Sequence, residues 1–300
     1  MTTSTNRLCV ISVSDYEAGE QKTWQDELAL LEALSNQDID EDFDVVLVES
    51  TQVKDQPVPD QLYLYIPQLK ILYYDSIQSA VLKDYGVSQC PHEYIAVLES
   101  DCTPTHNWLR ELMAGLTSGD YAAASGRTYY GENSSYRRAC NLLHRAWDDP
   151  GRSGQTDKVS NNGAIYHREI LQAFPYPHAA TPFLSAELRN DRIREAGNVF
   201  YMAREGAMQH AIGGLTFLWD LQRNKGHQCM SVSAHKSLSL LMREKLKLDW
   251  FHAKRIGKQY LRWYDWPLFV FLSCYEVVPH LVGARYAREE VEVIPGSSYR

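Results

Sequence analysis

A short apolar run that ends in two carboxylates constrains the fold of this chain most. Residues 94–98 read YIAVL, and Glu99, Ser100 and Asp101 follow directly. An apolar run of this length is typical of a strand buried on both faces. Ligands of open α/β sheets bind beyond the carboxyl ends of strands, and Mg²⁺ and Mn²⁺ prefer oxygen ligands. The stretch therefore predicts a strand that delivers two carboxylates to a divalent cation, although solvated loop acids share this spacing.

Strands and helices alternate through the first half of the sequence. Residues 7–14 and 43–48 predict two more buried strands, and residues 23–34 carry apolar side chains at helical spacing. After the acidic turn, Thr103 and Pro104 have the residue types of a helix N-cap and a first helical position. This alternation predicts an α/β fold with a mostly parallel, Rossmann-like sheet flanked by helices.

Composition restricts the classes of function. The chain has 300 residues and a net charge of −8, and no basic stripe with interleaved aromatic residues predicts a nucleic-acid partner. Its six cysteines form no CxxC pair, which favours reduced thiols and a cytoplasmic location. The sequence also holds no uninterrupted apolar run of 18 residues, the length that predicts a membrane-spanning helix.

The last 70 residues differ from the rest, so we expect a domain of residues 1–230 and a helical extension of residues 231–300. Residues 236–264 predict a basic helix, and residues 266–287 predict a largely apolar one that Glu276 interrupts. One interpretation is an extension packed on the main domain. The other is a peripheral contact of residues 236–300 with the anionic inner face of a membrane. A spanning helix is disfavoured because Glu276 would lie near the middle of the bilayer.

Three segments together resemble the family 2 glycosyltransferases of GT-A fold. Residues 82–101, LKDYGVSQCPHEYIAVLESD, are similar to that family's ARN-x-G stretch, linker, EYI-x-FLD strand and acid-x-acid metal motif. Residues 161–171, NNGAIYHREIL, resemble its small-residue turn, strand and Arg-Glu helix start. Residues 193–210, IREAGNVFYMAREGAMQH, resemble its ending, with the final histidine at the family's distance from the glycine. The resemblance covers residues 7–214 and implies transfer of a sugar from a nucleotide-diphosphate donor to an acceptor hydroxyl, with inversion.

The resemblance also implies where a metal and the donor bind. Glu99 and Asp101 take the place of the metal carboxylates, and His210 that of a further contact to the metal or diphosphate. A bound Mn²⁺ or Mg²⁺ would stabilise the charge that develops on the leaving group. The donor, a UDP- or GDP-sugar, is expected on Ser12, Ser14, Asp15, Glu49, Lys83, Ser100, Asn162 and Gly163, with Asn161 beside them. Simpler interpretations are a solvated turn acid for Glu49, a tight turn for residues 161–163 and a strand-end histidine for His210.

An inverting transfer needs a general base on the acceptor hydroxyl. The family usually carries a Glu-Asp pair at the head of the helix before IREAG, whereas residues 183–197 here, FLSAELRNDRIREAG, offer one acid there. Glu187 is the expected base, and Asp191, one helical turn later on the same face, is the reserve. Both also fit solvated acids of an exposed helix.

The sequence departs from the family pattern in several places. Ser-Val-Ser-Asp follows the first strand instead of Pro-x-Tyr-Asn, and Lys83 replaces an arginine. The QxxRW signature of processive synthases is missing, which favours a single addition to a glycan, glycolipid or small-molecule acceptor. Two alternatives stay open. One is a non-catalytic relative that binds a nucleotide sugar, which would explain the departures. The other is a nucleotidyltransferase, which should have a Gly-rich basic loop after the first strand. Residues 13–20, VSDYEAGE, are acidic there, which speaks against it.

Overall fold

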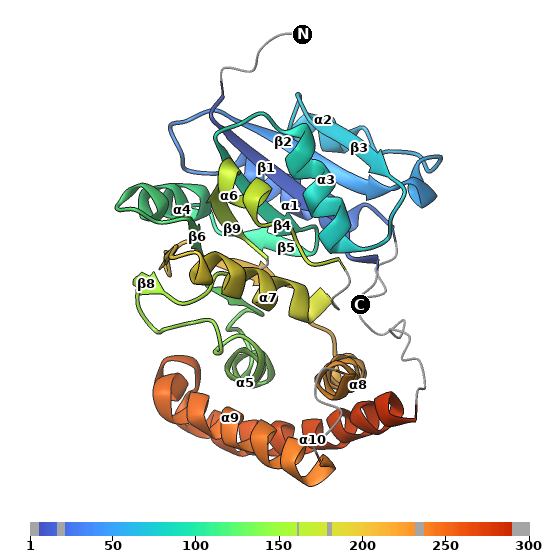
Figure 1. The fold of residues 1–300 in the computed structure, drawn as a ribbon, viewed down its shortest axis with the longest axis vertical. Helices are drawn as coiled ribbons and strands as arrows, with labels where there is room; N and C mark the ends of the chain where they lie inside the picture. The colour runs from blue at the N-terminus through green and yellow to red at the C-terminus, as the bar shows by residue number, and fades with distance from the viewer. Residues whose placement is uncertain (1–5, 17–21, 161, 179–181, 232–236, 290–300) are drawn as a thin grey trace. The chain divides into compact units, whose positions relative to one another are not determined.

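The computed structural model describes residues 6–16, 22–160, 162–178, 182–231 and 237–289 (Figure 1). The chain divides into two compact units. The first comprises residues 1–17, 21–128 and 152–210, and the second comprises residues 18–20, 129–151 and 211–300. This division falls elsewhere than the domain boundary expected after residue 230, which stays a prediction.

The first unit is built on a mixed, mostly parallel sheet. Its eight strands run in the order β3-β2-β1-β4-β9-β6-β10-β8. Strands β3, β2, β1 and β4 are mutually parallel, and β9 and β8 run antiparallel to their neighbours. The bounds are β1 Leu8–Val13, β2 Phe43–Ser50, β3 Lys70–Tyr74, β4 Tyr94–Glu99, β6 Ala123–Ser125, β8 Gly154–Thr156, β9 Ala164–His167 and β10 Phe200–Met202. The predicted α/β class is confirmed.

Helices cover both faces of this sheet, because successive side chains of a strand point to opposite sides. Leu8 and Val10 of β1 pack with residues of helices α1 and α4, whereas Ile11 and Val13 pack with residues of α3, α6 and α7. The helices of this unit are α1 Gln25–Ser35, α2 Gln61–Tyr65, α3 Ser79–Gln89, α4 Trp108–Thr117, α6 Arg168–Ala173 and α7 Pro182–Glu195, with a 3-10 turn at Thr51–Val53. Strand β1 is therefore buried on both faces, as its apolar sequence predicts.

The helix start predicted at Thr103 and Pro104 is wrong. These residues lie in the short strand β5 (Cys102–Pro104), which pairs antiparallel with β11 (Met208–His210). Strand β7 (Thr128–Tyr129) completes this small sheet, and α4 begins only at Trp108. Pairing with a strand about one hundred residues away overrides the local capping signal, and Pro104 is tolerated at the end of a short strand.

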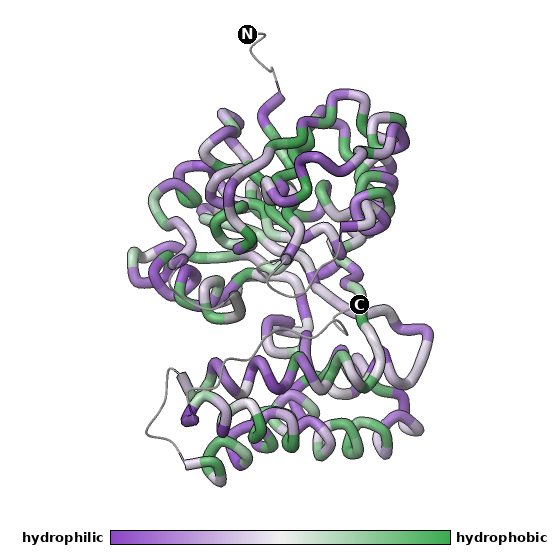
Figure 2. Tube along the Cα trace, turned by 90° about the vertical axis from the view of Figure 1, so that its right-hand side faces the viewer, coloured by the Kyte–Doolittle hydropathy of each residue, from purple (hydrophilic) through white to green (hydrophobic). Residues whose placement is uncertain are grey.

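The second unit is helical. It contains α5 Ser135–His144, α8 Leu215–Ser231, α9 Leu238–Tyr260, a 3-10 turn at Trp263–Asp265 and α10 Trp266–Arg288. Ser134 and Ser237 cap α5 and α9 through hydrogen bonds that their hydroxyls accept. Hydrophobic and hydrophilic residues alternate along these helices (Figure 2). Residues 263–288 form the one described helix long and apolar enough to cross a membrane, a test that core helices of soluble proteins also pass.

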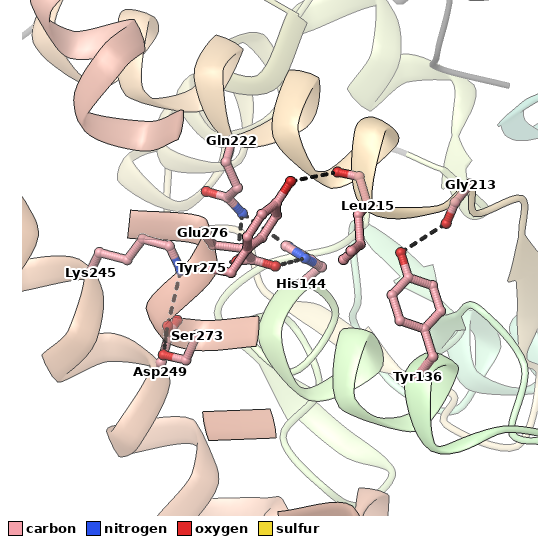
Figure 3. Close-up of polar contacts among 10 residues, drawn as sticks. All are labelled: Tyr136, His144, Gly213, Leu215, Gln222, Lys245, Asp249, Ser273, Tyr275 and Glu276. Carbon is pink, nitrogen blue, oxygen red and sulfur yellow. Dashed lines mark hydrogen bonds and ion pairs between the residues drawn. The ribbon is translucent and has the colours of Figure 1, made fainter. Parts of the chain in front are cut away.

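Glu276 interrupts the apolar α10 because it holds the centre of a buried polar cluster (Figure 3). Its carboxylate lies 2.8 Å from His144 Nε2, accepts a hydrogen bond of 2.9 Å from Gln222 Nε2 and lies 3.1 Å from Lys245 Nζ. Burial alone would raise the pKa of Glu276, but His144 and Lys245 outweigh it and lower that pKa to about 2. The cluster thus joins α10 to α5, α8 and α9 through one ionised carboxylate.

Helices α8 and α10 approach each other backbone to backbone. A Cβ on Gly226 would lie 1.8 Å from the carbonyl oxygen of His280, and a Cβ on Gly283 would lie 1.8 Å from that of Arg223. No side chain fits at either position without separating the helices, so the two glycines set the distance between them.

We expect Gly283→Ala to lower the free energy of unfolding by at least about 1–3 kcal/mol, because the added methyl forces the two backbones apart. Gly214→Ala is the matched control, since a Cβ there meets no atom within 4 Å. Urea denaturation of the full chain measures both. Equal stability of the two variants would show that α8 and α10 do not pack this closely.

Candidate functional site

The carboxyl ends of β1, β2 and β4 bring several predicted donor residues to one edge of the sheet. Val13 pairs with Val48 on one side and with Glu99 on the other, so Ser14 follows β1 directly between those two strand ends. Its hydroxyl lies 3.3 Å from Glu49 Oε1 and 3.4 Å from Ser100 Oγ. Parallel register therefore unites Ser14, Glu49 and Ser100.

Glu49 is bound by a lysine that sequence reasoning missed. Lys22 Nζ lies 2.6 Å from Glu49 Oε1 and 2.7 Å from Glu27 Oε1, and its side chain is 1% exposed. The same ammonium stands 4.0 Å from the centre of the Trp24 ring, a cation–π contact. Burial, helped by the charge of Glu27, raises the pKa of Glu49 against the opposing effects of Lys22 and Tyr16. The edge thus holds two carboxylates and one ammonium in a buried cluster.

Little in the sequence could have revealed this cluster. Lys22 belongs to no motif. An acid in the first turn of a helix, such as Glu27, ordinarily interacts with the partial positive charge of the helix N-terminus. A local clue exists only in the structure. Trp24 is the only described non-glycine residue with a positive φ, which is 61°. Such backbone conformations cluster at functional sites.

Glu99 and Lys83 are bound to each other. Lys83 reaches from α3 and is completely buried, with Nζ 2.7 Å from Glu99 Oε1. Burial would raise the pKa of Glu99, but the charge and hydrogen bond of Lys83, with help from His210 and Asn162, lower it. Glu99, which was predicted to bind the metal, is therefore paired with Lys83, which was predicted to bind the diphosphate.

Asp101 and His210 come together in the way a metal site requires. The register of β5 and β11 places His210 opposite Cys102, and His210 Nε2 lies 3.3 Å from Asp101 Oδ2. Ligand atoms of Asp101, Cys102 and His210 all lie within 4.8 Å of one another. A carboxylate and an imidazole on a partly exposed edge fit Mn²⁺ well, and a diphosphate and water can supply its remaining ligands. Of the three predicted ligands, Asp101 and His210 are adjacent, and Cys102 was not foreseen.

The turn before β9 needs its glycine. Gly163 has a φ of 86°, and a Cβ there would lie 2.5 Å from the terminal methyl of Met208. Its N–H donates to the carbonyl of Val97 in β4, which places Asn162 beside the end of that strand. Asn161 lies outside the described residues. Of the other predicted donor residues, Ser12 is completely buried within β1, and Asp15 is partly buried.

Both predicted bases lie on α7. Glu187 is exposed, and Asp191 forms a 2.7 Å ion pair with Arg194. Within the described chain, neither carboxylate makes a hydrogen bond or ion pair with Glu99, Asp101 or His210. The metal and donor residues thus contact one another, whereas the two candidate bases make no such contact with Glu99, Asp101 or His210 among the described residues.

Lys83→Gln should lower the free energy of unfolding at pH 7 by about 3–5 kcal/mol, because it leaves the buried Glu99 carboxylate without its counter-ion. In the wild type the lowered pKa of Glu99 favours the folded state above that pKa. In the variant, unopposed burial raises this pKa, so the loss should shrink toward pH 4 as Glu99 takes up a proton.

Urea denaturation at the two pH values measures this effect, with Lys83→Gln/Glu99→Gln as the control that removes both charges. A double variant as unstable as the single one would rule out the ion pair as the cause.

Comparisons with known proteins give one family model and two solved structures to which this chain is similar. Residues 28–173 match the model of a family described as glycosyl transferase family 2. The fold is similar to two crystal structures of S. aureus TarS 1-349. The one in complex with UDP shares 12% identity and a TM-score of 0.46, over 95% of this chain and 92% of that chain. The other shares 13% identity and a TM-score of 0.45, with the same coverage. A comparison with curated proteins gives no match. Residues 28–173 therefore match the family that the sequence motifs resemble, and the recognition of glycosyl transferase family 2 from those motifs is confirmed.

Proposed function

We propose that the protein transfers a sugar from a nucleotide-diphosphate donor, a UDP- or GDP-sugar, to an acceptor hydroxyl, with a divalent cation as cofactor. The observation that carries this proposal is the approach of Asp101 and His210 to 3.3 Å at the edge where Ser14, Ser100 and Glu49 meet. Glu49, Ser100 and Asp101 of this edge lie within residues 28–173, which match the family 2 model, and such strand ends are where α/β sheets bind nucleotides.

Asp101 and His210 would hold Mn²⁺ or Mg²⁺, which when bound neutralises the charge growing on the leaving diphosphate. Ser14, Ser100 and Glu49 are placed to orient the nucleoside, since hydroxyl and carboxylate oxygens can accept hydrogen bonds from a base or a ribose. Asn162 and Gly163 stand beside them, next to β4. Lys83 keeps the buried Glu99 carboxylate ionised and balances its charge.

We assign the general base for an inverting transfer to Glu187 in preference to Asp191. Asp191 is engaged by Arg194, whereas the Glu187 carboxylate is exposed and has no hydrogen-bond partner in the described chain. An exposed carboxylate on α7 can receive the proton of an acceptor hydroxyl once that acceptor is bound.

A non-catalytic nucleotide-sugar-binding relative is the second candidate. It is favoured by one observation, the engagement of Glu99 by Lys83, which leaves the metal with fewer protein carboxylates. Turnover separates the two candidates, because both predict donor binding.

Asp101→Ala should abolish the gain in donor affinity that Mn²⁺ gives, because it removes the carboxylate ligand. Isothermal calorimetry with UDP and with GDP, with and without Mn²⁺, measures this gain. Asp120→Ala is the control, since Asp120 is exposed in the turn that follows α4. Metal-independent binding in the wild type would refute the cation's role.

Glu187→Gln should leave donor binding intact and eliminate sugar transfer, and unchanged transfer would place the base elsewhere.

We also propose that the second unit contacts the anionic cytoplasmic face of a membrane through α9 and α10. Exposed residues recur on α9 at helical spacing and mix aromatic, aliphatic and basic types: Leu240, Lys247, Phe251, Lys254 and Lys258. Trp263 follows with 84% of its surface exposed. Aromatic and basic side chains on one helix face suit an interface with anionic lipids.

Helix α10 continues this surface with apolar side chains. Val270, Phe271 and Val278 are exposed at spacings of one, seven and eight residues, on one side of the helix. The Trp250 ring of α9 packs edge-on against Phe269, next to Val270, which joins the two exposed stripes. A glycan or glycolipid acceptor held at the membrane would then lie close to the enzyme.

The triple variant Lys247→Glu/Lys254→Glu/Lys258→Glu should lose binding to phosphatidylserine-containing vesicles by more than tenfold, because each basic residue near such a surface contributes about 1 kcal/mol. Vesicle flotation at low salt measures the loss, with neutral phosphatidylcholine vesicles and an Arg152→Glu variant in the other unit as controls. Failure of the wild type to float with anionic vesicles would contradict the proposal.

A further inference from the structure

Two thiols and an imidazole gather at the amino end of the main sheet. Cys9 is the second residue of β1, Cys90 is the C-cap of α3, and His92 lies two residues before β4. The sulfurs of Cys9 and Cys90 are 3.3 Å apart, and ligand atoms of all three residues lie within 4.8 Å of one another. This group lies at the opposite end of β1 from Ser14, so it is separate from the proposed donor site.

A carboxylate orients the imidazole. His92 Nε2 lies 3.0 Å from Asp44 Oδ2, and Asp44 Oδ1 accepts a hydrogen bond of 2.9 Å from Asn6. Histidines that ligate a metal through one nitrogen commonly donate from the other to a carboxylate, which fixes the ring and increases its basicity. With Nε2 directed at Asp44, Nδ1 is the nitrogen left for a metal.

We propose that Cys9, Cys90 and His92 form a binding site for a thiophilic d¹⁰ cation, with Zn²⁺ as the expected ion. Two sulfurs and one imidazole nitrogen are the ligand set that zinc prefers, and a water molecule is its ordinary fourth ligand. The ligands deprotonate on binding, so the two thiols release their protons to solvent and no electron transfer is needed.

The surroundings support a built site. Cys9, Cys90 and His92 are each at most 4% exposed, and Asp44 is 8% exposed. Buried thiols alone often pack as small apolar groups. A buried imidazole held by a buried carboxylate beside two thiols is a polar arrangement that simple packing does not require.

The ion would tie together segments that are distant in sequence. Cys9 and Cys90 are 81 residues apart, and Asp44 lies between them in the chain. Metal binding to the folded state alone contributes to folding stability. This site would also differ in preference from Asp101 and His210, because sulfur ligands select zinc whereas oxygen ligands suit Mn²⁺ and Mg²⁺.

Titration of the reduced full-length protein with Co²⁺, a spectroscopic substitute for Zn²⁺, tests this proposal without an activity assay. One equivalent should produce thiolate-to-cobalt charge-transfer absorption that Zn²⁺ abolishes. Cys90→Ser and His92→Gln should lose this signal, and Asp44→Asn should weaken binding by about 10–100-fold. Cys274→Ser, which alters an exposed cysteine, should behave as wild type.

A measurement on the wild type alone covers the case in which these variants misfold. Zn²⁺ should slow alkylation of Cys9 and Cys90, followed by mass spectrometry, and leave that of Cys274 unchanged. Absence of the thiolate signal, or no protection of Cys9 and Cys90 by zinc, overturns the proposal. A Cys9–Cys90 disulfide that persists under reductant would also overturn the proposal.

Discussion

The parallel alignment of β1 with β2 and β4 is the constraint on which the rest of the first unit depends. It fixes three strand ends side by side, so Ser14, Glu49 and Glu99 reach one edge whatever the loops do. Side chains of these strands are buried on both faces, and a slip of one residue would move every one of them to the other side of the sheet. The position of the candidate site is therefore set by the core and not by the loops that carry its residues.

The α/β class and the acid-bearing strand end could be predicted, because each depends on local apolar runs and on the family's spacing. The partners of individual side chains could not. Lys22 binds Glu49, which lies 27 residues further along the chain. Lys83 binds Glu99, although the sequence assigned Lys83 to the donor and Glu99 to the metal. Such pairings depend on which charges are buried together, and sequence spacing carries no record of that. The misassigned helix start at Thr103 has the same origin, a partner strand distant in the chain.

Burial of charge also distinguishes the two units. In the first unit, Lys83 and Lys22 sit against carboxylates at the edge of the sheet, where a ligand could exchange with them. In the second unit, Glu276 is enclosed by side chains from three other helices, and its charge is satisfied within the bundle. A buried ion pair contributes little net stability, but it strongly disfavours arrangements that separate its members. The charges of the first unit therefore lie where a ligand could replace their partners. The Glu276 cluster instead specifies how the helices assemble.

The two glycines between α8 and α10 have a consequence for that carboxylate. Gly226 faces the backbone at residue 280, and Gly283 faces the backbone at residue 223, so the helices run antiparallel and meet in a single register. Gln222 of α8 and Glu276 of α10 belong to the same seam, and they meet only if this register holds. A translation of one helix by a turn would withdraw the amide from the carboxylate. Steric fit between two residues without side chains thereby decides whether the buried carboxylate of Glu276 keeps its hydrogen bond from Gln222.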